Sequence, residues 1–145
     1  SRVSPEVLNK PGRLSDKEFE EIKTHPVHSH GILKQNAKVD PDVLLGVVQH
    51  HEKHDGTGYP HGVSGTGIGK TGVIIGLADV YDALTSKRVY KEAWSHEDTL
   101  QVIRDGAGTQ FDPDLVDIFL ARPKDLVRIR DQYPDRKSHP LARNQ

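Results

Sequence analysis

The sequence contains no cysteine, which excludes disulfide bonds and thiolate metal sites. No apolar run approaches the roughly 18 residues that a transmembrane helix needs, and no signal peptide is visible. The 20 basic and 21 acidic side chains give a net charge of −1, so no strong overall field attracts nucleic acid or an anionic membrane. The sequence therefore predicts a cytoplasmic protein without nucleic-acid or membrane partners, in which any phosphate site must be a local cluster.

The chain is long enough for one domain with a single core, at 145 residues. Hydrophobic residues make up 34% and charged residues 28%, which is typical of a rather polar module. The unusual feature of the composition is its nine histidines.

Helix-start signals recur along the chain and predict an all-α fold. Ser15 with Glu18 forms a capping box, Ser95 with Asp98 resembles one, and proline follows the N-cap candidates Asp40 and Asp112. The expected helices run from Ser15 toward Thr24, from Pro26 to about Gln35, from Asp40 to His51, over 73–85, from Ser95 to about Gly106 and from Asp112 through Leu120. We expect a domain over 1–125 and an extension over 126–145, with a frayed tail from residue 134.

His50 and His51 end the third expected helix. His51 continues the apolar row of Leu44, Val47 and Val48, and His50 continues another inward row, so both lean toward the interior. A buried imidazole needs a partner for each nitrogen, and a metal ion is one such partner. The alternative is a pair of hydrogen-bonded structural histidines.

Asp79 and Asp82 lie three residues apart in the apolar segment 73–85, which we interpret as a buried helix. A buried carboxylate is costly unless it is paired with a cation or a metal ion. The alternative is that the two aspartates mark a solvated stripe of the helix. His25 precedes a helix-starting proline and can be a simple cap. Together His25, His50, His51 and Asp79 form a nitrogen and oxygen ligand set that suits Mn, Fe, Zn or Ni.

Two further features bear on ligand binding. A glycine-rich loop follows the histidine pair and presents Tyr59 and Pro60 as a stiff tip, placed to cover a substrate or simply to form a surface turn. Arg88 and Lys91 are spaced so that they can hold phosphate oxygens together, or lie on a solvated surface.

In order and spacing these segments resemble the HD-GYP domain family, bacterial metal-dependent phosphodiesterases of the HD superfamily that cleave cyclic di-GMP. The longest matching stretch is His50-His51-Glu52-Lys53-His54-Asp55-Gly56-Thr57-Gly58-Tyr59-Pro60. The other matching stretches are Pro5 to Gly12, Lys23 to Pro26, Ala78 to Ser86 with Arg88, Tyr90 and Lys91, and Phe111 to Pro113. The resemblance covers roughly residues 3 to 120.

The resemblance implies an HD-superfamily helical bundle with two divalent transition-metal ions, Fe, Mn, Ni or Zn, and cyclic di-GMP as substrate. It implies that His25, His50 and His51 ligate one ion and Asp79 another, with Glu52 supporting the cluster. The residues that it implies bind the substrate are Tyr59, Asp82, Arg88 and Lys91. It also suggests a diguanylate-cyclase (GGDEF) domain as a partner at the loop, and the sequence is compatible with a homodimer.

The chain departs from the family pattern at its beginning. The His-Asp pair of the family is expected a few residues before Pro5, and the sequence begins at Ser1. Ser1 and Arg2 lie where the family has the Gly-Lys that follows this pair. We therefore interpret the chain as the C-terminal portion of the domain, without its N-terminal helices, and expect little hydrolysis by this portion alone. The alternatives are a degenerate module that binds cyclic di-GMP or a diguanylate-cyclase partner without cleaving the ligand, and an HD-superfamily phosphohydrolase acting on mononucleotides.

Overall fold

The computed structural model describes residues 3–8, 10, 12–36, 38–86 and 92–133, and within them it is helical. The elements are α1 (Pro5–Leu8), α2 (Asp16–Ile22), α3 (His25–Lys34), α4 (Pro41–Gln49), the 3-10 turn η1 (Gly65–Gly67), α5 (Lys70–Thr85), α6 (His96–Asp105), α7 (Pro113–Leu120) and α8 (Pro123–Gln132). In these ranges the sole β-type pairing is an isolated bridge between Ala107 and Phe111. The all-α prediction is confirmed.

Side-chain caps explain where several helices begin. Ser15 Oγ accepts the Glu18 N–H while the Glu18 carboxylate accepts the Ser15 N–H at 2.7 Å, which completes the predicted capping box. Asp40 and Asp112 each accept the N–H two residues ahead, at 2.7 and 2.9 Å, and a proline occupies the first turn in both helices. Ser95 Oγ accepts an N–H at the start of α6 in the same way.

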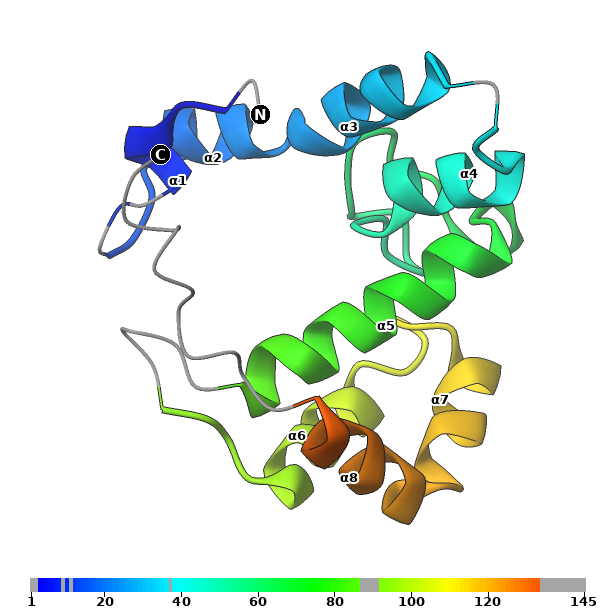
Figure 1. Cartoon of the computed structure of the whole chain (residues 1–145). Helices are drawn as coiled ribbons and strands as arrows, with labels where there is room; N and C mark the ends of the chain where they lie inside the picture. Colours follow the sequence, from blue (N-terminus) through cyan, green and yellow to red (C-terminus); the bar gives the residue numbers. More distant parts are fainter. Residues whose placement is uncertain (1–2, 9, 11, 37, 87–91, 134–145) are drawn as a thin grey trace.

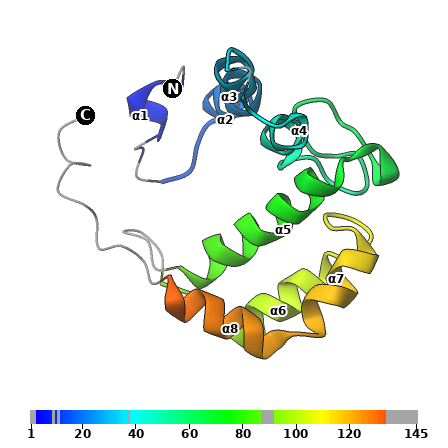
Figure 2. The ribbon, with the colours of Figure 1, turned by 45° about the vertical axis from the view of Figure 1, so that its right-hand side comes forward.

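Helix α5 is the central element of the arrangement. Figures 1 and 2 show α1 to α4 on one side of α5 and α6 to α8 on the other. The main core lies on the second side, where Leu77 and Tyr81 of α5 pack with Ile103, Phe111 and Val116. On the first side α4 lies against α5, and α3 lies against α4. The histidine-bearing segments thus meet the face of α5 that is turned away from the core.

Helix α5 is less buried than its apolar sequence predicted. It begins at Lys70, and the side chains of Ile74 and Ile75 are 55% and 37% exposed. The expectation of a buried helix is therefore wrong for part of its surface: α4 and α6 pack against two sides of α5, whereas Ile74 and Ile75 remain partly open to solvent. No helix among them combines the length and the apolar character needed to cross a bilayer.

The ends of the chain differ in detail from the sequence-based picture. Helices α1 and α8 were not expected, and the predicted domain boundary at residue 125 falls inside α8. Leu126 of α8 packs against the core cluster, so this helix extends the α6–α7 side of the fold. Helix α4 stops at Gln49 rather than continuing to His51.

Candidate metal centre

Three imidazoles from two segments come together beside α5. One ring nitrogen from each of His25, His50 and His51 lies within 4.8 Å of the others, and within the described residues this is the one group of three or more side chains that could hold a metal ion. The ring centroids are 4.0 Å apart for His50 and His51 and 4.9 Å apart for His25 and His51. The predicted convergence of these three side chains is confirmed.

Backbone carbonyls fix the tautomers of two of the imidazoles. The Nδ1 atoms of His25 and His50 lie 2.8 Å from the carbonyl oxygens of Ile22 and Val47. Because a carbonyl oxygen can only accept, each Nδ1 carries the hydrogen and donates it. In the neutral rings each Nε2 is therefore unprotonated and carries a lone pair, which is the arrangement that metal-ligating histidines usually show.

The spacing between the ring nitrogens of His25 and His51 fits a shared ion. Nε2 of His51 lies 3.2 Å from Nε2 of His25. Two nitrogens at about 2.1 Å from one ion are separated by roughly 3.0 Å at an octahedral angle and 3.4 Å at a tetrahedral angle. The residues present thus fit a divalent transition metal, for which imidazole is a preferred ligand.

Burial favours the uncharged form of His51, as ligation requires. Burial first, and then the neighbouring His50 and His25, lower the pKa of His51 from 6.5 to about 4. Tyr59 stacks on this ring with centroids 4.8 Å apart and an interplanar angle of 27°. The Tyr59 pKa is raised by burial and by Asp79, so the phenol keeps its hydrogen and can donate it to a ligand.

The histidine pair is held in place by contacts on either side. Gln49 is buried and accepts the Gly69 N–H at 2.8 Å, which ties the end of α4 to the start of α5. Gly58 lies so close to the backbone of 51–53 that a Cβ there would be 2.5 Å from the His51 carbonyl oxygen. Tyr59 N–H donates to that same oxygen at 3.1 Å, so the loop and the histidine pair form one unit.

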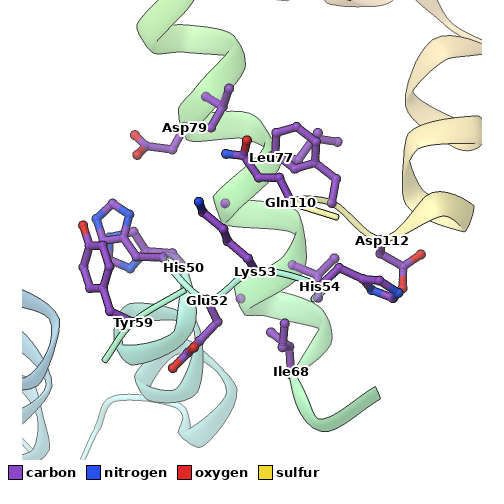
Figure 3. A pocket seen from close by; sticks show the side chains of 16 residues that line it. His50, Glu52, Lys53, His54, Tyr59, Ile68, Leu77, Asp79, Gln110 and Asp112 are labelled. Atoms are coloured by element: carbon purple, nitrogen blue, oxygen red, sulfur yellow. The ribbon is translucent and has the colours of Figure 1, made fainter. Parts of the chain in front are cut away.

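Glu52 has a different role from the one expected. Its side chain is fully buried, and its two oxygens accept the N–H groups of His61 and Val63 at 2.7 and 3.0 Å. Figure 3 shows the carboxylate directed away from His50 and Asp79. The prediction that Glu52 supports the metal cluster is wrong, because its hydrogen bonds close the glycine-rich loop instead.

The two aspartates of α5 are exposed, contrary to the burial argument made for them. Asp79 stands outside the three-imidazole group but lines the same cavity as His50, His51 and Tyr59. Asp82, one turn further along, accepts a hydrogen bond from Ser86 at 3.3 Å. The roles of Asp79 as a ligand and of Asp82 as a substrate contact remain predictions, and Arg88 and Lys91 lie outside the described residues.

The cavity also contains side chains that the sequence did not single out. It measures about 110 Å³ and extends from the imidazoles along α5 to the segment before α7. Lys53 and Gln110 line it, and Figure 3 shows both pointing in the direction of Asp79. Lys53 belongs to the stretch from His50 to Pro60 that resembles the HD-GYP family, whereas nothing in the sequence near Gln110 indicates that its side chain lines the same cavity as the histidines.

Comparison with known proteins agrees with this geometry. A family model described as HD domain matches residues 4–115. The chain is 40% identical over 139 residues to a cyclic di-GMP phosphodiesterase of Vibrio cholerae, covering 92% of this chain and 28% of the relative. It is 36% identical over 140 residues to a cyclic di-GMP phosphodiesterase response regulator of Xanthomonas campestris, covering 95% of this chain and 37% of the relative.

A solved structure shares the fold. The crystal structure of a cyclic GMP-AMP-specific phosphodiesterase of V. cholerae superposes with a TM-score of 0.59 at 22% identity, over 85% of this chain and 31% of that chain. The chain spans about a third of the length of the two curated relatives. The matched span and these relatives show that the chain belongs to the HD domain family, in its HD-GYP branch.

Proposed function

We propose that this protein is a metal-dependent phosphodiesterase that hydrolyses cyclic di-GMP. The observation that supports the proposal most directly is the convergence of three imidazoles, two of them with Nδ1 tied to a backbone carbonyl. The named activities of the relatives in V. cholerae and X. campestris agree with it. We expect two ions, from among Fe, Mn, Ni and Zn, and a cytoplasmic location.

The residues of the chain would have distinct roles at such a site. His25, His50 and His51 would hold one ion, and Asp79 would provide an oxygen ligand for another. Ions bound there would supply Lewis-acid stabilisation of phosphate charge and would lower the pKa of water. Tyr59 covers one face of His51 and presents a protonated hydroxyl at the cavity, where it can orient a phosphate or base edge.

The test combines catalysis with metal content. The longest form of the protein that its gene encodes should contain at least one ion per chain and hydrolyse cyclic di-GMP. His51→Ala should abolish hydrolysis, while the control His30→Ala, outside the imidazole group, should not. Fewer than one ion per chain, or equal rates for wild type and His51→Ala, would contradict the proposal. Parallel assays with 3′3′-cyclic GMP-AMP would establish the preferred cyclic dinucleotide.

A second candidate function is a binding module that does not catalyse. It is favoured by the position of Asp79 outside the three-imidazole group, which leaves the described cluster with nitrogen ligands only. Tight binding of cyclic di-GMP by the metal-loaded protein with no product formed would support this alternative. The diguanylate-cyclase partner and the homodimer remain predictions from the resemblance and the sequence.

A further inference from the structure

The cavity beside the imidazoles contains one ammonium group among its described lining residues, that of Lys53. In Figure 3 its side chain extends along the cavity, with the nitrogen between His50 and the amide of Gln110. No hydrogen bond or ion pair occupies this nitrogen within the described part of the chain. A cation is therefore presented to the cavity without a protein partner.

The backbone that bears Lys53 is held from both sides. On one side the buried Glu52 carboxylate accepts two loop N–H groups. On the other side His54 N–H donates to the Gln110 carbonyl at 3.2 Å and Asp55 N–H donates to the Thr109 carbonyl at 2.9 Å. Because these bonds fix the main chain, ligand binding costs Lys53 little backbone entropy, and only its side-chain torsions become restricted.

The size of the cavity limits which part of a ligand can enter it. At about 110 Å³ it is much smaller than the roughly 300–1,000 Å³ of pockets that enclose whole small molecules. A cyclic dinucleotide can thus insert only a portion of itself. The portion that suits neutral imidazoles, metal ions and an ammonium is an anionic phosphate, and lysine is a frequent phosphate-binding residue.

We propose that Lys53 is a substrate-binding residue, whose ammonium contacts a phosphate oxygen of the cyclic dinucleotide at the end of the cavity away from His25, with the Gln110 amide beside it. This inference rests on the proposed function, because it assumes a phosphodiester ligand in this cavity. Lys53 would hold the phosphate close to the imidazoles of the cavity, and its charge would offset the negative charge of Asp79 while the ligand is bound.

The competing explanation is that Lys53 stabilises the glycine-rich loop through electrostatic attraction to Asp55. The Asp55 carboxylate already accepts both the Thr57 N–H and its hydroxyl, at 2.9 and 2.7 Å, and these bonds are the larger causes of its lowered pKa, with Lys53 a lesser one. The loop is thus closed without Lys53. A role in stability and a role in ligand binding give different results when the side chain is changed.

The experiment compares Lys53→Gln, Lys53→Arg and the control Lys34→Gln, an exposed lysine in the last turn of α3. Calorimetry with Mn²⁺-loaded protein measures the dissociation constants of cyclic di-GMP and of inorganic phosphate, and urea unfolding measures stability. Lys53→Gln should weaken both ligands about ten- to hundredfold, the range for a hydrogen bond to a charged group. Lys53→Arg should recover most of the affinity, and Lys34→Gln should change it less than twofold.

Unchanged metal content and an unchanged unfolding midpoint in Lys53→Gln would assign the loss to the ligand contact. A lowered midpoint with equal affinities would overturn the proposal and assign Lys53 to the loop. If wild type binds inorganic phosphate but not cyclic di-GMP, and Lys53→Gln loses phosphate, the phosphate-binding role of Lys53 stands while cyclic di-GMP as the ligand is wrong. If wild type binds neither ligand, both are wrong.

Discussion

Gly76 allows α5 to approach the histidine pair, and replacing it gives a sharp test of how the site is built. A Cβ at this position would lie 2.8 Å from the carbonyl oxygen of His50, a backbone atom that cannot rotate away. To restore an ordinary contact of about 3.4 Å, the two segments must separate by roughly 0.6 Å. Asp79 follows Gly76 by one helical turn, so the same movement would draw Asp79 away from the imidazoles.

The size of the effect follows from two opposing contributions. Alanine is favoured over glycine in a helix by about 0.8–1 kcal/mol, whereas overpacking typically costs about 1–3 kcal/mol. Gly31 in α3 provides the matched control, because a Cβ there meets nothing within 4 Å. Gly31→Ala should therefore gain about 0.8–1 kcal/mol in the free energy of unfolding, and Gly76→Ala should be about 1–3 kcal/mol less stable than Gly31→Ala.

Urea unfolding of the metal-free variants measures this difference, and titration with Mn²⁺ measures the consequence for the site. We expect Gly76→Ala to bind metal more weakly and Gly31→Ala to bind it like wild type. Equal stability of the two variants, together with equal metal affinity, would refute the reasoning that the close approach of α5 to His50 positions the site.

Two other predictions follow from the site. Glu52→Gln should lower the free energy of unfolding by about 1.5–3 kcal/mol, because one of the two loop N–H groups then faces an amide NH₂. The control Glu6→Gln, at an exposed position, should change the free energy of unfolding by less than about 0.5 kcal/mol. Comparable urea midpoints for the two variants would contradict this prediction. In the presence of a chelator, wild type should lose stability as the pH falls from 6.5 toward 4, because the pKa of His51 is lowered to about 4 in the fold and the unfolded chain binds the proton first. His51→Gln should lose less over the same interval, and parallel stability profiles for the two proteins would show that His51 is not the cause.

Local signals determined how much of the fold was predictable. The caps at Ser15, Asp40, Ser95 and Asp112 act within three residues, so the sequence located the helices that they begin. Helix α8 begins at Pro123 after Arg122 without any side-chain cap, and its apolar residues are few, which left it unrecognised.

Burial and side-chain direction depend on tertiary neighbours, and there the sequence was a weaker guide. The apolar residues of α5 suggested burial on every side, yet the face that bears Asp79 is exposed. Glu52 stands next to two metal-ligand candidates, but its carboxylate turns to the loop because two N–H groups lie there. Gln110 joins the cavity through backbone bonds between distant segments, which no local pattern indicates.

The central claim is that His25, His50 and His51 share a metal ion, and an anomalous difference map tests it most directly. Crystals of the Mn²⁺- or Zn²⁺-loaded chain, measured at the absorption edge of the metal, should show a peak within about 2.0–2.3 Å of the Nε2 atoms of all three histidines. Metal peaks found only at other sites, with none among these imidazoles in a fully loaded protein, would contradict the account.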